Sequence, residues 1–488
     1  MKNVAIILQD LRSGGSERFA SRLSLLLSEK FNVYVLVFDA SEKRFDCAGE
    51  FVDLGLPAGK GTVKRAVIML KRAAAIRKFV KEHDICTAYS FTHAPNEALA
   101  LSGAKCKKYI SCRDYERLIK SAKLYSFALR RGCNILFNAL EMQKKCEELF
   151  PGNENKLFTA YNIIDCDKAR EDAKEELDGE FKKFYGTHRV IAFSSRFVGQ
   201  KCQWDMLKSF ELLKKNIPDA GLIFLGCRGE HENAVREMAQ RSAYSDDIIF
   251  AGFQKNVFKF VSRAEVFAMT SYYEGFPNVI VETLAVGTPT VSTDCTSGPA
   301  EVLAPSRPFL PHCDRMTQVE CGILCPVMSE TPDFDYGNIN GAHREYAKAL
   351  EAILTDEELR ARLSENGKKR ADELSAENEA KTKTVEAQDK ALNTAWYVFG
   401  TKSELKDQKI LKKGDVLKDN DFNKDYFTQI DIRKEKEIKL YSKRAELLTT
   451  HPQSSYELVK DDKGQLTLKI NNPNEFWSVS RYLVIQVR

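Results

Sequence analysis

The sequence predicts an α/β protein with two tandem doubly wound, Rossmann-like domains and a small β-rich domain at the C-terminal end. Through about residue 375, short apolar runs alternate with segments of helical periodicity, as expected for parallel sheets covered by helices. A charged stretch at 165–183 divides this alternation into two series. After about residue 393, short β-type runs take over, so we expect about three domains for 488 residues.

The first series begins with an apolar strand at 3–8. A helical pattern through Phe19, Leu23 and Leu27 follows, and it leads to a second apolar strand at 32–38. Strand, helix and strand in this order, without polar alternation in the strands, indicate a parallel βαβ unit. Further strands of this domain are expected at 84–90, 107–111 and 134–138.

The second series begins with the apolar run at 189–194. Further strands are expected at 221–225, 248–251, 265–269 and 289–293. Two doubly wound domains in tandem would enclose a cleft that faces the C-terminal ends of the strands and the N-termini of the helices. We therefore expect the functional site in this cleft.

These patterns define four segments of the chain. We assign 1–165 and 166–375 to the two doubly wound domains, 376–392 to a linking helix and 393–488 to the β-rich domain. Asp461-Asp462-Lys463-Gly464 in the last segment is a hairpin signal. No cysteine follows Cys325 and no methionine follows Met328, which indicates a separate origin for the tail.

Composition excludes several classes of protein. The 74 basic and 69 acidic residues leave a net charge of +5, too little for a protein that coats nucleic acid. The thirteen cysteines form no C-x-x-C pair, which argues for reduced thiols rather than disulfides or a zinc knuckle. The first apolar strand is too short for a secretory signal, and no window reaches the length of a membrane span. We expect a cytoplasmic protein.

The strongest local motif contains two glutamates eight positions apart, Glu274 and Glu282. Gly275 would let the backbone approach a ligand closely, and Pro277 suits the first turn of a helix. Eight residues of helix would bring both carboxylates toward one face. The free N–H groups at the start of that helix are a natural seat for an anion.

At these residues the sequence resembles the retaining GT-B glycosyltransferases with an E-x7-E motif, a family that includes sucrose synthases and many lipopolysaccharide and capsule enzymes. Gly14 and Gly15 resemble the glycine loop after the family's first strand, and Arg196 with Lys201 resembles its G-R-x4-K element. The remaining matches are Leu225-Gly226, 252–256 and 322–324. The resemblance covers about residues 1–375.

The resemblance implies a role for each matching residue. Glu282 would accept hydrogen bonds from the donor ribose, and Glu274 would hold hydroxyls of the transferred sugar. Arg196 and Lys201 would neutralise the leaving diphosphate, so that no metal and no other cofactor is expected. The donor-binding residues would be Gly14, Gly15, Gly226, Phe253, Gly275, Phe276, Pro277, Asn278 and Glu282. The first domain would take the acceptor and the second the nucleotide sugar.

The chain departs from the family pattern in two loops. Ser195 and Cys202 stand where the family usually has glycine. The Gly-x-Gly-Pro-Glu turn of the family appears here at 226–230 as Gly-Cys-Arg-Gly-Glu. These departures concern the path of the phosphate loop, and we expect activity in spite of them.

Two residues of the first domain are further candidates. His93 follows a strand end and would lie at the rim of the cleft, where the family often has a residue that touches sugar or acceptor, so we count it among the catalytic candidates. The alternative is a histidine with a structural role. Asp114 occupies a similar loop end and is a weaker candidate for handling the acceptor hydroxyl.

The segment 60–81 interleaves basic and apolar residues. Such a helix can lie on an anionic membrane surface, which would give peripheral contact with the inner face of the membrane. The alternative is a solvent-facing helix packed on its sheet. Three other motifs are rejected: 55–61 is too short for a P-loop, and the D-x-D triplets at 165–167 and 419–421 read as structural.

The tail resembles, more faintly, the end domain of coiled-coil envelope proteins of gut bacteria, through 379–392 and 395–400. It is either an engineered fusion partner or a natural interaction module. The predicted function is a retaining, metal-independent hexosyltransferase that moves a sugar from a nucleotide diphosphate to a surface-glycan or lipid-linked acceptor, without a nucleic-acid partner. The alternatives are a nucleotide-sugar epimerase or phosphorylase on the same fold, and a scaffolding protein organised by the tail.

Overall fold

The computed structural model describes the 488 residues apart from 13, 42–44, 60, 307–311, 413–414, 418–421 and 433–434, and gives the backbone alone for 376–393, 415 and 474. The chain divides into two compact units, Met1–Asn378 and Glu379–Arg488. The first unit contains two large sheets, which we call the first half and the second half of that unit.

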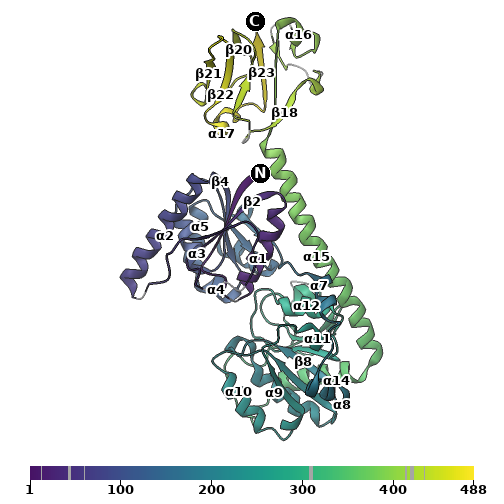
Figure 1. Cartoon of the computed structure of the whole chain (residues 1–488). Coiled ribbons are helices and arrows are strands. Elements are labelled where there is room, and N and C mark those ends of the chain that lie inside the picture. The colour runs from purple at the N-terminus through teal and green to yellow at the C-terminus, as the bar shows by residue number, and fades with distance from the viewer. Residues whose placement is uncertain are drawn as a thin grey trace. The chain divides into compact units, whose positions relative to one another are not determined.

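The first half is a seven-stranded, fully parallel sheet in the order β3-β2-β1-β4-β5-β6-β7. Helices lie on both sides of it (Figure 1). The strands are β1 (Lys2–Leu8), β2 (Phe31–Val37), β3 (Glu50–Asp53), β4 (Ile85–Ser90), β5 (Lys107–Cys112), β6 (Asn134–Phe137) and β7 (Leu157–Thr159). The helices are α1 (Gly15–Ser28), α2 (Thr62–Glu82), α3 (His93–Leu101), α4 (Tyr115–Lys120), α5 (Ala122–Arg130) and α6 (Leu140–Leu149).

The second half has the strand order β10-β9-β8-β11-β12-β14-β13, parallel except for the antiparallel edge strand β13. The strands are β8 (Arg189–Ser194), β9 (Ala220–Leu225), β10 (Ile248–Gly252), β11 (Val266–Met269), β12 (Thr290–Thr293), β13 (Thr317–Val319) and β14 (Gly322–Cys325). The helices are α7 (Cys166–Asp172), α8 (Gly179–Thr187), α9 (Gln203–Lys214), α10 (Glu232–Gln240), α11 (Phe258–Val261), α12 (Asn278–Ala285), α13 (Pro299–Leu303), α14 (Gly341–Thr355) and α15 (Glu357–Asn393).

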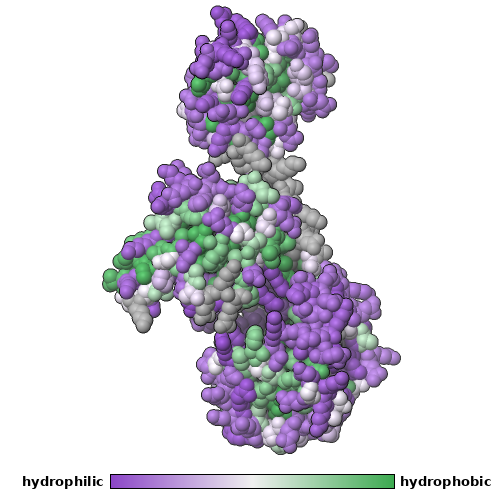
Figure 2. Space-filling model, in the orientation of Figure 1, coloured by the Kyte–Doolittle hydropathy of each residue, from purple (hydrophilic) through white to green (hydrophobic). Residues whose placement is uncertain are grey.

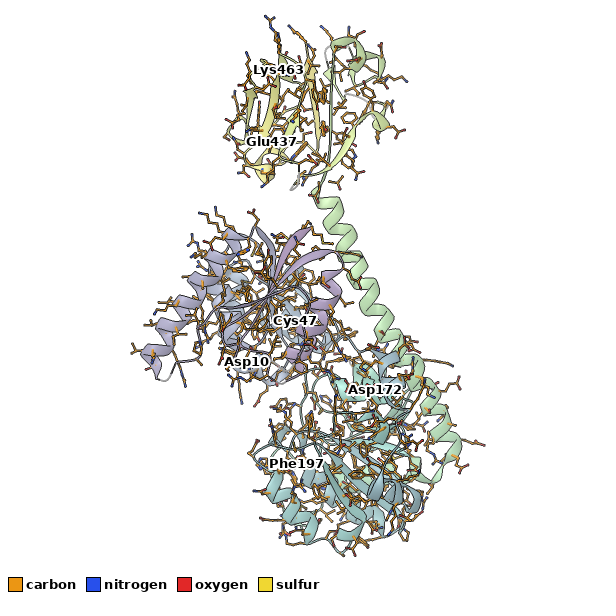
Figure 3. All side chains as sticks on the ribbon, in the orientation of Figure 1. Asp10, Cys47, Asp172, Phe197, Glu437 and Lys463 are labelled. Carbon is orange, nitrogen blue, oxygen red and sulfur yellow. The ribbon has the colours of Figure 1, made fainter. Side chains whose placement is uncertain are left out.

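The predicted α/β class is confirmed by both sheets. Consecutive residues such as Ile6 and Ile7 of β1 are both fully buried, because helices cover both faces of the sheet. Figure 3 shows the side chains of each half, with Phe197 among those of the second half, where it is 1% exposed. The expected strands all form. Within the first unit, the sequence missed the short strands β3, β7, β13 and β14, which offer only three or four residues to a pattern.

Helix α15 continues well beyond the second half. Its early residues pack into the first unit, where Ala371 and Leu374 are buried and Arg170 of α7 donates to Asp372 at 2.6 Å. The predicted linking helix 376–392 is therefore the last part of one continuous 37-residue helix. The proposed domain boundary at 165/166 falls between β7 and α7.

The second unit is β-rich, as predicted. A four-stranded sheet has the order β18-β15-β23-β20, a three-stranded sheet has the order β19-β22-β21, and β16 pairs with β17. The strands are β15 (Thr394–Gly400), β16 (Leu411–Lys412), β17 (Asp415–Val416), β18 (Thr428–Asp431), β19 (Glu437–Lys439), β20 (Ala445–Leu447), β21 (Tyr456–Lys460), β22 (Leu466–Ile470) and β23 (Tyr482–Val487); two short helices are α16 (Lys402–Asp407) and α17 (Pro473–Phe476). Gly464 turns the predicted hairpin between β21 and β22 with a φ of 74°.

Candidate active site

A cavity of about 490 Å³ lies within the first unit, between the ends of strands from its two halves. From the first half it is lined by the glycine loop, the start of α1 and the residues after β4, β5 and β6. The second half contributes the loop after β8 and the segment before α12. Its lining residues include Gly14, Gly15, Glu17, His93, Ser111, Arg113, Asp114, Arg117, Asn138, Asn162, Arg196, Gln200, Lys201, Glu274, Gly275, Phe276, Pro277 and Asn278.

The cavity brings most of the predicted site residues together. The residues that line it are Gly14, Gly15, His93, Asp114, Arg196, Lys201, Glu274, Gly275, Phe276, Pro277 and Asn278. Gly226, Phe253 and Glu282 do not line it. Phe253 follows β10 and is 75% exposed. Glu282 contacts Arg18 of the first half instead.

Glu274 and Lys201 form an ion pair on the second-half wall. Lys201 Nζ lies 2.5 Å from Glu274 Oε1, and Gln200 Nε2 donates to the other oxygen at 3.4 Å. Glu274 is only 6% exposed, so the lysine compensates a charge that is largely removed from water. The family resemblance implies that Glu274 binds the transferred sugar and Lys201 the diphosphate. In the structure the two side chains pair with each other.

One geometric expectation about the two glutamates was wrong. Helix α12 begins at Asn278 with Pro277 at its N-cap, so Glu274 lies in the loop before the helix and only Glu282 is helical. Glu274 is fixed by the backbone instead, because its N–H donates to the carbonyl of Thr296 at 2.9 Å. The two carboxylates consequently do not share a helix face.

Glu282 is turned toward the first half. Its Oε1 accepts a hydrogen bond from Arg18 Nη1 at 2.9 Å, and the residue is 8% exposed. Arg18 belongs to α1, directly after the glycine loop. This ion pair therefore connects the two halves at the side of the cavity.

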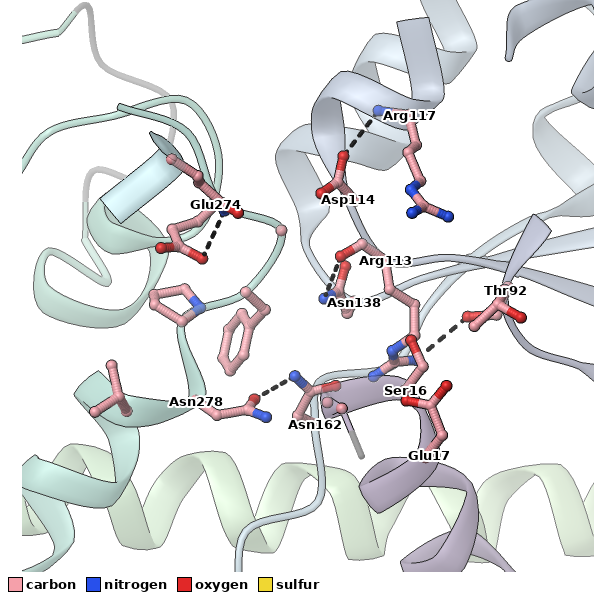
Figure 4. A pocket seen from close by; sticks show the side chains of 18 of the residues that line it. Ser16, Glu17, Thr92, Arg113, Asp114, Arg117, Asn138, Asn162, Glu274 and Asn278 are labelled. Carbon is pink, nitrogen blue, oxygen red and sulfur yellow. Dashed lines mark hydrogen bonds between the residues drawn. The ribbon is translucent and has the colours of Figure 1, made fainter. Parts of the chain in front are cut away.

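Gly275 is required where the two halves meet. A Cβ at this position would lie 2.1 Å from the carbonyl oxygen of Arg113 in the first half, so no larger residue fits without a shift. Next to it, Phe276 stacks on Tyr161 with 4.9 Å between ring centroids. Asn278 accepts a short hydrogen bond from Asn162. The segment before α12 thus lies against the first half (Figure 4).

The loop after β8 explains one departure from the family pattern. Cys202 has a φ of 46°, in the left-handed region that favours glycine, and this is the position where the family usually has glycine. Its buried thiol donates to the carbonyl of Gly199 at 3.4 Å. Gly226 packs closely against the same loop, since a Cβ there would lie 2.1 Å from the carbonyl oxygen of Ser195. Gly226 therefore shapes the loop without lining the cavity.

The glycine loop ends at an open helix N-terminus. Gly14 is the N-cap of α1 with a φ of 148°, and it has no side chain that could cap the helix. Glu17, in the first turn, also lines the cavity, and burial raises the pKa of its carboxyl. The start of α1 thus lies beside the cavity, and the Glu17 carboxylate accepts a backbone hydrogen bond there.

His93 and Asp114 line the first-half wall with different local roles. His93 is the first residue of α3 and follows Thr92, which has a φ of 70°. Asp114 caps α4, because its Oδ1 accepts the N–H of Arg117 at 2.8 Å. Burial raises the pKa of the Asp114 carboxyl. Asp114 therefore has a structural role, whatever it contributes to a ligand.

Sequence reasoning missed the polar side chains that follow β5 and β6. Arg113 and Asn138 line the cavity, and Asn138 Nδ2 donates to the carbonyl of Arg113 at 3.4 Å (Figure 4). It also missed Glu301 of α13, whose carboxylate accepts the N–H groups of Leu140 and Glu141 at 2.9 and 2.8 Å and so caps α6. No local pattern marks any of these three residues, and only the fold brings them to the interface between the two halves.

Metal-binding candidates are few in the described part of the chain. There, no group of three or more His, Cys, Asp or Glu side chains is placed to hold a metal ion. In the triplet at 165–167, Asp165 caps α7 by accepting the N–H of Lys168 at 2.9 Å, and the side chain of Asp167 is 97% exposed. The triplet at 419–421 lies outside the described residues.

A family match adds to this geometry. Residues 174–308 match the family described as glycosyl transferases group 1. Within this segment the chain is similar to the group 1 glycosyl transferases. The matched segment contains the lining residues of the second half, among them Arg196, Lys201 and Glu274, and it also contains Glu282.

Curated relatives of the chain are glycosyltransferases. An uncharacterized glycosyltransferase of Methanocaldococcus jannaschii, MJ1059, is 29% identical over 268 residues, which cover 54% of this chain and 64% of that protein. A second relative, 24% identical over 76% of this chain and 95% of its own length, is the N-acetylgalactosamine-N,N'-diacetylbacillosaminyl-diphospho-undecaprenol 4-alpha-N-acetylgalactosaminyltransferase of Campylobacter jejuni.

Solved structures share the fold. A glycosyltransferase of Rickettsia africae superposes with a TM-score of 0.60 at 13% identity, covering 80% of this chain and 99% of its own. Anabaena Alr3699/HepE in complex with UDP gives a TM-score of 0.58 at 16% identity, covering 79% of this chain and all of its own. At these identities the likeness supports the two-domain glycosyltransferase fold.

Proposed function

We propose that the chain is a retaining, metal-independent glycosyltransferase that moves a sugar from a nucleotide diphosphate donor to a surface-glycan or lipid-linked acceptor. The observation that carries this proposal is the second-half wall of the cavity. It places Glu274, Lys201 and Arg196 beside the helix-start segment 276–278, within the segment that matches the glycosyltransferase family. A wall of this kind offers an acceptor for sugar hydroxyls next to two cations for phosphates.

In the proposed reaction, negative charge grows on the diphosphate as the sugar leaves. Arg196 and Lys201 would stabilise that charge, together with backbone N–H groups at the start of α1 and near 276–278. Because Lys201 is paired with Glu274 before a donor binds, donor binding would break this ion pair. The diphosphate would take the lysine and the sugar hydroxyls would take the carboxylate. Charges supplied by side chains leave no step that requires a metal.

The nucleoside would extend past the cavity along the second half. Glu282 would bind the ribose hydroxyls, which requires Arg18 to give up its 2.9 Å contact with that carboxylate. Phe253 is exposed after β10 and offers a ring face on which a base can stack. Gly226 holds the loop that carries Ser195 and Arg196. His93, on the opposite wall, would contact the transferred sugar or the acceptor.

The lipid-linked part of the proposal is supported by α2 and by the relatives. The Campylobacter relative is named for a diphospho-undecaprenol substrate. Helix α2 exposes Val63, Val67 and Leu70, at 78%, 46% and 64%, and an apolar area lies over the start of this helix in Figure 2. Exposed basic residues flank them, namely Lys64, Arg65, Lys71, Arg77, Lys78 and Lys81. We propose that this face touches an anionic membrane peripherally.

Both readings of 60–81 find support in α2. Its inner face packs on the sheet through Ile76, Phe79 and Val80, and Arg72 turns inward to donate to the carbonyl of Leu56 at 2.9 and 2.6 Å. The outer face remains apolar and basic. Residue 60 lies outside the described residues. Within the described chain, no helix is long and apolar enough to cross a membrane.

Product analysis tests the proposed function against its alternatives. With a UDP- or GDP-sugar and membrane extract as the acceptor source, we expect transfer that needs acceptor, survives EDTA and retains the anomeric configuration. Isomerised donor without acceptor would indicate an epimerase, and dependence on free phosphate would indicate a phosphorylase. No turnover, with normal folding, would favour the scaffolding alternative. Strict dependence on Mn²⁺ or Mg²⁺ would contradict the metal-free mechanism.

A further inference from the structure

Arg113 lies in the wall of the cavity and pairs with no carboxylate among the described residues. It follows β5 on the first-half side, and its guanidinium carbon lies 3.8 Å from the centroid of the Phe19 ring. Its Nη1 donates weakly to Ser111 Oγ at 3.4 Å, whereas its Nη2 is shielded from solvent and has no acceptor among the described residues. Burial lowers the pKa of Arg113 to about 9.

Asn138 has a buried acceptor oxygen, whereas Arg113 has a buried donor. It follows β6, the neighbour of β5, and is 2% exposed. Its Nδ2 donates to the carbonyl of Arg113, but its Oδ1 is buried and accepts nothing from the part of the chain that the structure describes. An unmet donor and an unmet acceptor are costly when buried, and these two belong to residues that line one wall of the same cavity.

The second-half cations differ from Arg113 in their surroundings. Lys201 is paired with Glu274, and Arg196 is exposed to solvent. Arg113 has neither advantage. Stacking on Phe19 satisfies one face of its guanidinium but not its donors, which form a planar fork suited to a phosphate. A ligand anion is the missing partner that would fit this arrangement.

We propose that Arg113 and Asn138 form an acceptor subsite, in which Arg113 holds a phosphate-type anion and Asn138 Oδ1 accepts a hydrogen bond from a neighbouring hydroxyl. This inference rests on the proposed function, because Arg196 and Lys201 are taken to hold the donor diphosphate on the opposite wall. The ligand class is an acceptor that carries a phosphate or diphosphate. The carbonyl of Arg113 also meets Gly275, so such an acceptor would lie beside the sugar-binding loop.

Calorimetric titration of the full chain with inorganic pyrophosphate, with and without saturating UDP, tests this subsite. We expect pyrophosphate to bind in the presence of UDP, and Arg113→Gln to weaken that binding at least tenfold while UDP affinity stays within twofold. Arg113→Lys should lose less, because it keeps the charge without the fork. Arg131→Gln, a change to an exposed arginine outside the cavity, is the matched control and should alter neither titration.

Three results would overturn the inference. Pyrophosphate that does not bind beside UDP, or binds equally to wild type, Arg113→Gln and Arg113→Lys, would remove the subsite. A parallel loss of UDP and pyrophosphate affinity in Arg113→Gln would make Arg113 a donor residue instead. If no nucleotide binds at all, the proposed function fails. In that case, pyrophosphate titrations of wild type and Arg113→Gln without nucleotide still decide whether Arg113 binds an anion.

Discussion

The two walls of the cavity solve the problem of buried charge differently. On the second-half wall, the carboxylate of Glu274 already has Lys201 as a partner. On the first-half wall, Arg113 and Asn138 keep buried polar atoms with no partner among the described residues. On the second-half wall, an ion pair neutralises the buried charge until a ligand binds. On the first-half wall, a ligand would supply the hydrogen bonds that the buried polar atoms lack. Under the proposed function, the second-half wall with Glu274, Lys201 and Arg196 is the donor wall, and the first-half wall with Arg113 and Asn138 is the acceptor wall.

The largest expected effect falls on the cations of the donor wall. Arg196→Ala and Lys201→Ala should each lower kcat by about 100-fold or more, because both would stabilise charge on the leaving diphosphate. Single-turnover rates with saturating nucleotide sugar measure this effect. Arg131→Ala, on the surface of the first half, serves as the control. Turnover that survives both active-site changes would place the phosphates elsewhere.

The two glutamates should separate sugar from nucleotide. Glu274→Ala should reduce turnover by about 100-fold without weakening UDP, and should tighten UDP slightly because Lys201 is released from its ion pair. Glu282→Ala should instead cost about 1–3 kcal/mol in nucleotide affinity through lost ribose hydrogen bonds. Calorimetry with UDP or GDP, paired with kinetics, gives both quantities. Equal losses of binding and turnover in Glu274→Ala would refute its assignment to the sugar.

A pH effect should arise where the two halves join. Burial raises the pKa of the Glu301 carboxyl from an ordinary 4.5 to about 7, although it caps α6. Between these values the folded protein holds a proton that the unfolded chain has released. The free energy of unfolding should therefore fall as pH rises, by up to about 1.4 kcal/mol per pH unit from this group.

Glu301→Gln should remove that contribution. Urea denaturation between pH 4.5 and 7.5 would show a shallower decline for Glu301→Gln than for wild type, whereas Glu29→Gln, at an exposed carboxyl, should keep the wild-type slope. Identical slopes for wild type and Glu301→Gln would mean that the Glu301 carboxyl does not titrate in this range.

The smallest effect is expected from removing the second unit. A chain that ends after Leu392 should keep its turnover, because both sheets and every proposed site residue lie in the first unit. A chain that ends before Ala371 should unfold more easily, since Ala371 and Leu374 are buried in the first unit. Comparing melting temperature and turnover of the two truncations measures both. Loss of turnover in the longer truncation, with folding and nucleotide binding intact, would give the tail a role in acceptor recognition.

The sequence predicts the donor wall better than the acceptor wall for a physical reason. Glu274, Gly275 and Lys201 lie in loops whose local residue types are tied to local geometry, such as a glycine that must meet another backbone. The sheets follow equally directly from apolar runs such as 189–194. Both signals are local, so a single sequence carries them.

The missed features depend on tertiary contacts. Arg113 and Asn138 are 25 positions apart, and only the pairing of β5 with β6 brings them together. The Arg18–Glu282 ion pair spans 264 positions. The helix expected to hold both glutamates begins four residues later than Glu274, because Pro277 takes the N-cap and the loop before it is held by Thr296. No local pattern reports such contacts.

The most direct test of the central claim is nucleotide-induced stabilisation of the wild type and of a double variant, Arg196→Ala with Lys201→Ala. For wild type, UDP or GDP at 100 times its Kd should add about 2.7 kcal/mol to the free energy of unfolding. The same concentration should add little to the double variant, because its donor wall lacks both cations. Equal stabilisation of the two proteins, or none of the wild type by any nucleotide diphosphate, would contradict the assignment of this cavity to a nucleotide-sugar donor.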